Sequence, residues 1–160
     1  MTWSRVVTRR IHADHATVFT LLAEVELWPA LFPHVRSARV LRRDGRRRLI
    51  VVRARWRGLP LGYTAVQTVD APQGRMTIRH LSRLTRGSVA VWDVRPAPDP
   101  GAPTDDVELS VHQQVVVPIP LVGSLLAHCF VGGRVARDLG QAMLERVKQV
   151  AEGGSLADRR

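Results

Sequence analysis

"LWPALFPHV", residues 27–35, places a tryptophan and a phenylalanine around two prolines, directly after a helix-like run. Two prolines so close together prevent a continuous helix, yet the segment is too apolar for an ordinary solvated loop. We therefore predict that residues 27–35 turn the chain from a helix into a sheet. Trp28 and Phe32 are expected to line the rim of a buried apolar space at this turn.

The residues before this turn predict one strand and one helix. Residues 3–11, "WSRVVTRRI", are rich in β-branched side chains and favour a strand. Asp14 is a suitable N-cap for a helix over residues 15–27. The apolar positions at helical spacing are Val18, Leu21, Leu22 and Val25. The helix is expected to end near Leu27, because the residue before Pro29 is biased away from helical angles. Residues 30–32 can add one short helical turn.

Six strand-like runs follow, separated by turn signals such as Asp44-Gly45. They cover residues 35–43, 46–56, 61–69, 74–84, 87–95 and 106–117. From Val122 to Val150 the apolar spacing is helical again and predicts one long amphipathic helix that ends near residue 152. An antiparallel sheet of seven strands twists and curls around such a helix. We predict an α+β fold with a single domain over residues 1–152 and a flexible tail over residues 153–160.

Composition limits the class of protein. The net charge is +10, and every basic residue except Lys148 is an arginine. This bias reflects either genome composition or a basic surface that attracts an acidic protein, a phosphate-bearing ligand or nucleic acid. No nucleic-acid-binding motif accompanies the arginines, so nucleic acid is the less favoured partner. No apolar run spans a bilayer and no signal peptide is visible, so a cytoplasmic location is expected. The single Cys129 excludes a disulfide framework within the chain.

Strand alternation predicts which polar side chains face inward. His80 shares a face with Met76 and Ile78, and an imidazole there could act as general base on a ketone. The alternative is a core histidine whose ring is hydrogen-bonded to a backbone group or to Gln113. Tyr63 could donate a hydrogen bond to a carbonyl or enolate oxygen, or could simply pack at the sheet rim.

The remaining candidate binding residues are amides and aromatics. Gln67 and Gln113 could orient a ligand carbonyl or hold a buried water. Five aromatic side chains could either stack on a flat ligand or form part of the ordinary core. They are Trp28, Phe32, Trp56, Trp92 and, on the long helix, Phe130. No metal-ligand spacing, nucleophile elbow or glycine-rich phosphate loop is present, so neither a metal nor a cofactor is expected.

Residues 18–45, "VFTLLAEVELWPALFPHVRSARVLRRDG", resemble the START-like helix-grip superfamily, which includes Bet v 1-type proteins, polyketide cyclases/aromatases and coenzyme Q-binding proteins. The similarity is to the polyketide cyclase/dehydrase branch, through Glu26, Trp28-Pro29, Phe32 and Asp44-Gly45. Residues 118–148 are similar to the closing helix of that branch. The resemblance covers roughly residues 5–150. It implies a deep, mainly apolar cavity between the sheet and the long helix.

The resemblance also implies which positions contact a ligand. Aromatase/cyclases have a pocket tyrosine where this chain has Val35, and a pocket arginine late in the strand that here offers Gln67, Thr68 and Val69. The first hypothesis is therefore a cyclase-type protein that holds a polyketide or acyl intermediate by shape, with His80 or Tyr63 assisting proton transfer. An acidic acyl carrier protein could deliver that intermediate.

Two other hypotheses stay open. A non-catalytic lipid or quinone carrier or chaperone would use the same pocket, so the sequence leaves open whether the protein is an enzyme. An RNA- or ribosome-associated module would depend on the positive charge alone.

Overall fold

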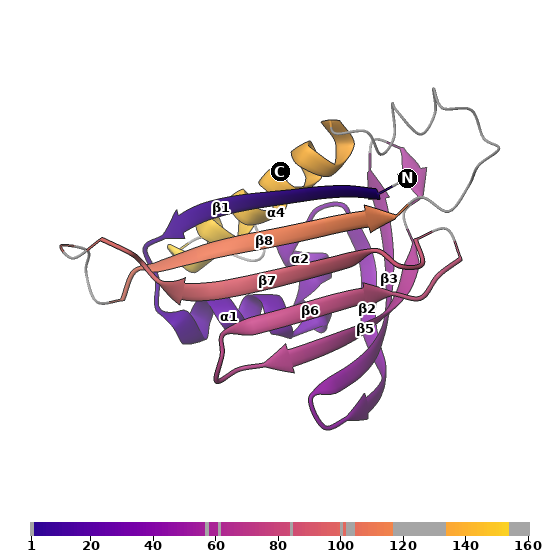
Figure 1. Ribbon diagram of the computed structural model, residues 1–160, viewed down its shortest axis with the longest axis horizontal. Coiled ribbons are helices and arrows are strands. Elements are labelled where there is room, and N and C mark those ends of the chain that lie inside the picture. Colours follow the sequence, from indigo (N-terminus) through magenta and orange to yellow (C-terminus); the bar gives the residue numbers. More distant parts are fainter. Residues whose placement is uncertain are drawn as a thin grey trace.

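The computed structural model describes residues 2–56, 58–60, 62–83, 85–99, 101, 105–116 and 134–153. Within these ranges an antiparallel sheet with the strand order β1-β8-β7-β6-β5-β3-β2 surrounds the helices (Figure 1). The elements are β1 (Thr2–Ile11), α1 (His15–Ala23), η1 (Val25–Leu27), α2 (Trp28–Leu31), β2 (Val35–Asp44), β3 (Arg47–Trp56), β4 (Leu59–Pro60), β5 (Tyr63–Asp70), β6 (Arg75–His80), β7 (Val89–Pro96), β8 (Val107–Val116) and α4 (Arg134–Ala151). The predicted α+β helix-grip fold and its element order are confirmed.

The sheet is strongly curved, and the helices lie on its concave side. Figure 1 shows β2 and β3 running steeply across the direction of β7 and β8. The helix α4 packs against β1, α1 and α2, while α1 also contacts β7. The two-residue strand β4 pairs only with the end of β3. This arrangement leaves a space between the curled sheet and α4 that side chains from both must line.

Alternation along the strands separates the core from solvent as predicted. Ile50 and Val52 of β3 are buried, and so are Met76 and Ile78 of β6. The arginines that follow these residues on the same strands point to the outer face, and Arg53, Arg55 and Arg79 are exposed. His112 of β8 is likewise exposed and lies 2.7 Å from the hydroxyl of Ser4. The period-two pattern was therefore sufficient to assign the inner faces of β3, β5, β6 and β8.

The helix after β1 begins as predicted but ends earlier. Asp14 caps α1 by accepting a hydrogen bond from the backbone N–H of Thr17 at 2.9 Å. The predicted end near Leu27 is wrong, because α1 ends at Ala23 and Glu24 is extended, with φ −89° and ψ 92°. The carbonyl of Ala23 accepts hydrogen bonds from Arg48 at 2.9 Å and from Gln67 at 3.0 Å. These side chains from the sheet hold the helix end in place.

The residue before Pro29 also departs from the prediction. Trp28 has helical angles, φ −59° and ψ −36°, and opens the one-turn helix α2. Proline near the start of a helix is well tolerated, since its missing N–H would have no partner there. The chain then leaves α2 at Phe32, which is extended, and enters β2 at Val35.

The strand β6 is shorter than predicted, and α4 is only partly described. β6 ends at His80, and turns follow it, in which the N–H of Thr85 donates to the carbonyl of Ser82 and the N–H of Ser88 donates to the carbonyl of Thr85. The predicted N-terminal part of the long helix, with Phe130 and Cys129, lies outside the described residues, as does the tail after residue 153. α4 ends at Ala151, close to the predicted position.

Among the described residues, no helix is long and apolar enough to cross a membrane.

Candidate functional site

A cavity of about 340 Å³ lies between the inner face of the sheet and α4. Its apolar lining comes from the α2–β2 turn, the central strands and α4, and includes Trp28, Val35, Val52, Ala54, Ile78, Ala90, Trp92, Leu139 and Met143. Its polar lining includes His34, Tyr63, His80, Thr85, Ser88, Gln113 and Gln114. We call it the inner cavity. It therefore contains six of the predicted site residues, namely Trp28, Val35, Tyr63, His80, Trp92 and Gln113.

His80 and Tyr63 form a stacked pair in the wall of the inner cavity. Their ring centroids are 4.2 Å apart with an interplanar angle of 29°. The two rings are neighbours because of the pairing of β5 with β6, in which His80 lies opposite Ala65. Tyr63 is two residues before Ala65 on β5 and therefore shares its face of the sheet. Burial lowers the pKa of His80 to about 4 and raises the pKa of Tyr63. At neutral pH the imidazole is therefore uncharged and the phenol keeps its proton.

Three buried polar atoms of this cavity wall have no hydrogen-bond partner among the described residues. They are Nδ1 of His80, Oγ1 of Thr85 and Nε1 of Trp92. Trp92 is only 3% exposed, so water does not reach its indole N–H from outside. Buried polar groups in folded proteins nearly always find a partner. A ligand with oxygen or nitrogen atoms could supply partners for these three groups. The alternative that a backbone group or Gln113 bonds His80 Nδ1 is not seen.

Gln67 does not reach the inner cavity, contrary to the expectation that it orients a ligand. Its side chain is fully buried, and its Nε2 atom donates to the carbonyl of Ala23 at 3.0 Å and lies 3.0 Å from the sulfur of Met76. Gln67 shares a strand face with Tyr63 but lies four residues further along β5, beneath the end of α1. Its role in this structure is to hold that helix end.

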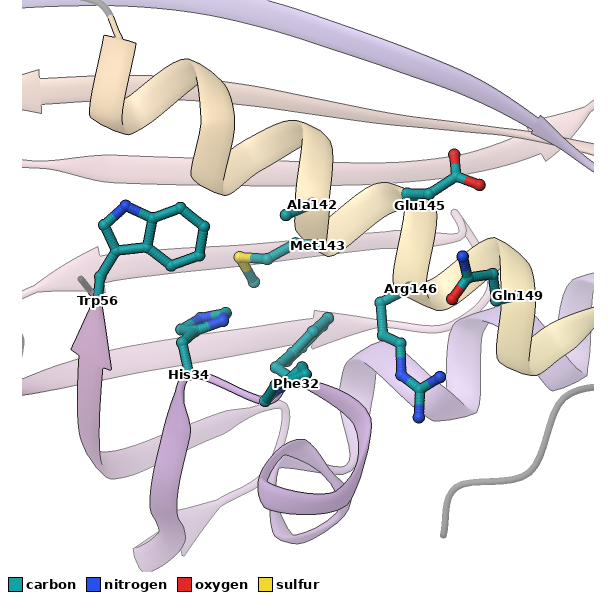
Figure 2. A pocket seen from close by; sticks show the side chains of 9 residues that line it. Phe32, His34, Trp56, Ala142, Met143, Glu145, Arg146 and Gln149 are labelled. Carbon is teal, nitrogen blue, oxygen red and sulfur yellow. The ribbon is translucent and has the colours of Figure 1, made fainter. Parts of the chain in front are cut away.

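A second cavity of about 520 Å³ lies beside the first, and we call it the outer cavity (Figure 2). Its lining comes from the α2–β2 turn, the end of β3 and the middle of α4, and consists of Phe32, Pro33, His34, Trp56, Ala142, Met143, Glu145, Arg146 and Gln149. The predicted residues Phe32 and Trp56 lie here rather than in the inner cavity. Phe32 is 1% exposed and meets Trp28 edge to face at 6.0 Å.

His34 is the site residue that the sequence analysis missed. It lines both cavities, and its ring lies 5.8 Å from that of Phe32 and 5.7 Å from that of Trp56, the latter at 89°. Burial lowers the pKa of His34 to about 4, so this imidazole is also neutral at pH 7. The signal was present, since a histidine within the apolar segment 27–35 must share the buried environment of its neighbours.

No group of three or more His, Cys, Asp or Glu side chains that could hold a metal ion occurs among the described residues.

A curved antiparallel sheet that packs on a C-terminal helix over a mainly apolar cavity defines the class of helix-grip folds. Residues 11–144 match the family "Polyketide cyclase / dehydrase and lipid transport". The match covers most of the chain, which therefore belongs to this family. No curated protein matches the chain in sequence.

Solved structures with the same fold include several cyclases. The Zhui aromatase/cyclase from Streptomyces sp. R1128 is similar with a TM-score of 0.75 and 17% identity, over 97% of this chain and 100% of that one. The di-domain aromatase/cyclase BexL of the BE-7585A biosynthetic pathway has a TM-score of 0.75 and 22% identity, over 96% of this chain and 51% of that one. A START superfamily protein from Mycobacterium smegmatis has a TM-score of 0.70 and 16% identity, over 92% and 98%. At these identities the similarity establishes the fold alone.

Proposed function

We propose that the protein binds a hydrophobic, oxygen-bearing polyketide or acyl intermediate in the inner cavity and promotes its cyclisation and dehydration. The observation that carries this proposal is the His80–Tyr63 pair, stacked at 4.2 Å in the wall of a mainly apolar cavity. Family membership supports the general kind of reaction. A cavity of about 340 Å³ is within the usual size range of small-molecule sites.

The protonation states of His80 and Tyr63 give the two rings different roles in the proposed reaction. Neutral His80 can accept a proton, because burial has lowered its pKa to about 4. Tyr63 stays protonated, because burial raises its pKa, so its hydroxyl can donate a hydrogen bond to a carbonyl or enolate oxygen. An acceptor and a donor side by side match the needs of enolisation, in which a carbon loses a proton while an oxygen gains negative charge.

The proposed reaction follows from this division. His80 takes a proton from a carbon next to a carbonyl group, and Tyr63 donates a hydrogen bond to the enolate oxygen. The enolate carbon forms a bond with a ketone carbon of the same chain, and the imidazolium returns its proton to that ketone oxygen. His80 then removes a second proton, and the new hydroxyl leaves with the proton of the imidazolium as water. The curved wall holds the chain so that the two carbons meet.

Proton exchange at a simple ketone tests this proposal without the natural substrate. We expect the protein to accelerate hydrogen–deuterium exchange at the methyl group of 2-acetylnaphthalene in D₂O, followed by NMR. His80→Phe keeps the ring stack but removes the base, so exchange should fall about 100-fold. Tyr63→Phe should reduce it less. His112→Phe is the matched control, because His112 is an exposed histidine on the outer face. Equal exchange rates for wild type and His80→Phe would refute a catalytic role of His80.

A non-catalytic carrier of lipids or quinones is the second candidate, and one observation favours it. A pKa of about 4 makes His80 a weak base. Tight binding of 2-acetylnaphthalene with no acceleration of exchange would support the carrier and exclude proton transfer by His80.

We also propose an acidic carrier protein as partner, on the strength of the outer face of the sheet. The exposed arginines of β2, β3 and β6 that have no ion pair within the described part of the chain include Arg39, Arg42, Arg47, Arg53 and Arg79. Such a surface attracts an acidic partner in a salt-dependent way. Arg39→Glu/Arg53→Glu should abolish salt-sensitive binding of a purified acidic acyl carrier protein. Arg95→Glu on β7 is the control, because Arg95 lies 3.9 Å from Asp93. Tighter binding to RNA than to the carrier protein would contradict the assignment.

A further inference from the structure

We propose that the inner cavity selects an uncharged ligand end, so that the group beside His80 and Tyr63 is a ketone, ester, thioester or amide carbonyl and not a free carboxylate or phosphate. This inference rests on the proposed function, because it takes the inner cavity as the place where the ligand binds, and it names the class of ligand that can enter. One observation carries it: none of the described residues that line this cavity has a charged side chain at pH 7.

Most polar side chains of the inner cavity gather at one place, where β5 begins, β6 ends and β7 begins; we call it the polar corner. Tyr63 and His80 are stacked there, and the N–H of His80 donates to the carbonyl of Ser88 at 3.0 Å. Gln113 of β8 lies opposite Ala90, two residues after Ser88. The rest of the lining is mainly apolar and comes from the α2–β2 turn, β3 and α4. A ligand therefore presents its polar group to this corner and its apolar body to the remaining wall.

The side chains of the polar corner are dipoles without charge. The hydroxyl of Ser88 is already used, since it donates to the carbonyl of Val116 at 3.4 Å and accepts from the N–H of that residue at 3.0 Å. Nδ1 of His80 and Oγ1 of Thr85 are buried and have no hydrogen-bond partner among the described residues. An imidazole and a hydroxyl can each donate or accept a hydrogen bond, and the hydroxyl of Tyr63 can donate one. These groups suit a carbonyl oxygen, but none of them offsets a full negative charge.

The two histidines of the lining do not supply the missing positive charge. Burial lowers the pKa of His80 and of His34 to about 4. At pH 7, which is three pH units above that value, about one imidazole in a thousand is protonated. A carboxylate in this cavity would therefore lie among neutral groups, and an ionised carboxylate costs far more to bury than an amide of the same shape.

Several arginines lie on the elements around the cavity, but the described lining contains none of them. Arg5 of β1 lies opposite Gln113 in the sheet, and Arg48 of β3 donates to the end of α1 at 2.9 Å. Arg83 and Arg86 belong to the turn after β6 and are exposed. Residues 117–133 lie outside the described part of the chain, and their sequence contains no Asp, Glu, Lys or Arg. The inner cavity is thus a neutral space in a chain with a net charge of +10.

A neutral cavity gives the protein a place in a reaction sequence. A carboxyl group that enters the cavity has to be masked as an ester, thioester or amide, because a free carboxyl group is ionised at pH 7. The reaction that activates or tethers the acid therefore comes before this protein. A hydrolysis that frees the acid comes after it.

Four naphthalenes of similar size test the inference by titration calorimetry at neutral pH. They are 2-acetylnaphthalene, methyl 2-naphthoate, 2-naphthamide and 2-naphthoate, of which only the last is charged. We expect the dissociation constants of the first three to lie within about fivefold of one another. We expect 2-naphthoate to bind at least about 100-fold more weakly than 2-naphthamide. The amide is the matched comparison, because it has the shape of the carboxylate without its charge.

Two lysine variants place a positive charge inside and outside the cavity. Leu139 is half-buried and lines the inner cavity from α4, so Leu139→Lys adds a cation to the wall. Gln141→Lys adds the same charge at an exposed position of α4 that lines neither cavity. Leu139→Lys should tighten the binding of 2-naphthoate at least about tenfold and weaken that of 2-naphthamide, whereas Gln141→Lys should change neither. Circular dichroism checks the folding of both variants, and if Leu139→Lys does not fold, the wild-type comparison of amide and carboxylate decides.

The outcomes separate this inference from the proposed function. Selection against charge is refuted if 2-naphthoate binds the wild type as tightly as 2-naphthamide does, or if a folded Leu139→Lys strengthens its binding no more than Gln141→Lys does. The inner cavity then remains a binding site. If none of the four naphthalenes binds, the proposed function fails and this inference fails with it.

Discussion

Gly140 of α4 lies directly over Gln113 of β8. A Cβ atom at Gly140 would stand 3.5 Å from Oε1 of Gln113, which is an ordinary van der Waals distance. The glycine is therefore not required by the close approach of helix and strand. Gly140→Ala should stabilise the protein by about 0.5–1 kcal/mol, because alanine loses less backbone entropy in a helix.

Urea unfolding measures this gain, and Gly153→Ala is the contrasting variant. Gly153 follows the end of α4 with φ +113°, a backbone conformation that side chains strain. Gly153→Ala should lower the urea midpoint of unfolding, whereas Gly140→Ala should raise it. A lower midpoint for Gly140→Ala would mean that Gln113 cannot adjust to the added methyl group.

The end of α1 depends on two side chains that bind the same carbonyl. Arg48 and Gln67 both donate to the oxygen of Ala23, at 2.9 and 3.0 Å. Either one alone keeps this oxygen bonded, so Gln67→Leu and Arg48→Met should each cost no more than about 1 kcal/mol of unfolding free energy. The double variant leaves the buried carbonyl without either donor and should cost at least about 1 kcal/mol more than the sum. A double-mutant cycle in urea gives this coupling, and an additive result would contradict the shared role.

Acid should destabilise the protein through its buried histidines. The pKa of His80 is about 4 in the folded state and 6.5 as its ordinary value. Between these values the unfolded chain binds a proton that the folded chain does not, so stability falls as the pH drops from 6.5 toward 4. At pH 5 the loss from His80 alone is about 2 kcal/mol relative to pH 7.

The pH dependence of unfolding in urea tests this sign and its source. His80→Phe should remove its share of the loss between pH 7 and pH 5, while His112→Phe, an exposed control, should not. His34 has the same lowered pKa and contributes in the same direction. Identical pH profiles for wild type and His80→Phe would show that His80 is not buried as a neutral group.

Local patterns in the sequence were sufficient for the strands and their faces. Alternation placed Val52, Ile78 and His80 inward, because a side chain on a pleated strand can only point to one of two faces. The N-cap at Asp14 was also local, since the capping atoms lie within three residues. The order of elements then restricted the fold to a curled sheet around a helix.

The features that the sequence could not supply depend on contacts between distant residues. The end of α1 at Ala23 is set by Arg48 and Gln67, which are 25 and 44 positions away in the chain. Strand alternation showed only that Gln67 faces inward, and on that basis it was predicted to contact a ligand. It could not show that the end of α1, 44 positions away in the chain, covers this side chain. The apolar segment 27–35 signals that His34 is buried, but only the folded turn brings its ring beside Trp56.

Trp28 and Trp92 provide a final test, because they are equally buried but differently bonded. They are 2% and 3% exposed, and both line the inner cavity. The indole N–H of Trp28 donates to the carbonyl of Leu22 at 3.1 Å, whereas that of Trp92 has no partner among the described residues. Trp28→Phe leaves the buried carbonyl of Leu22 without its hydrogen-bond donor. Trp92→Phe removes an N–H group that makes no hydrogen bond within the described residues of the free protein. Trp28→Phe should therefore lower the free energy of unfolding by about 1–2 kcal/mol more than Trp92→Phe does.

Ligand binding should show the opposite order. Trp92→Phe removes a donor for the ligand's oxygen and should weaken the binding of 2-acetylnaphthalene about fivefold. If Trp92→Phe instead costs more stability than Trp28→Phe and leaves binding unchanged, the Trp92 N–H is not a ligand contact.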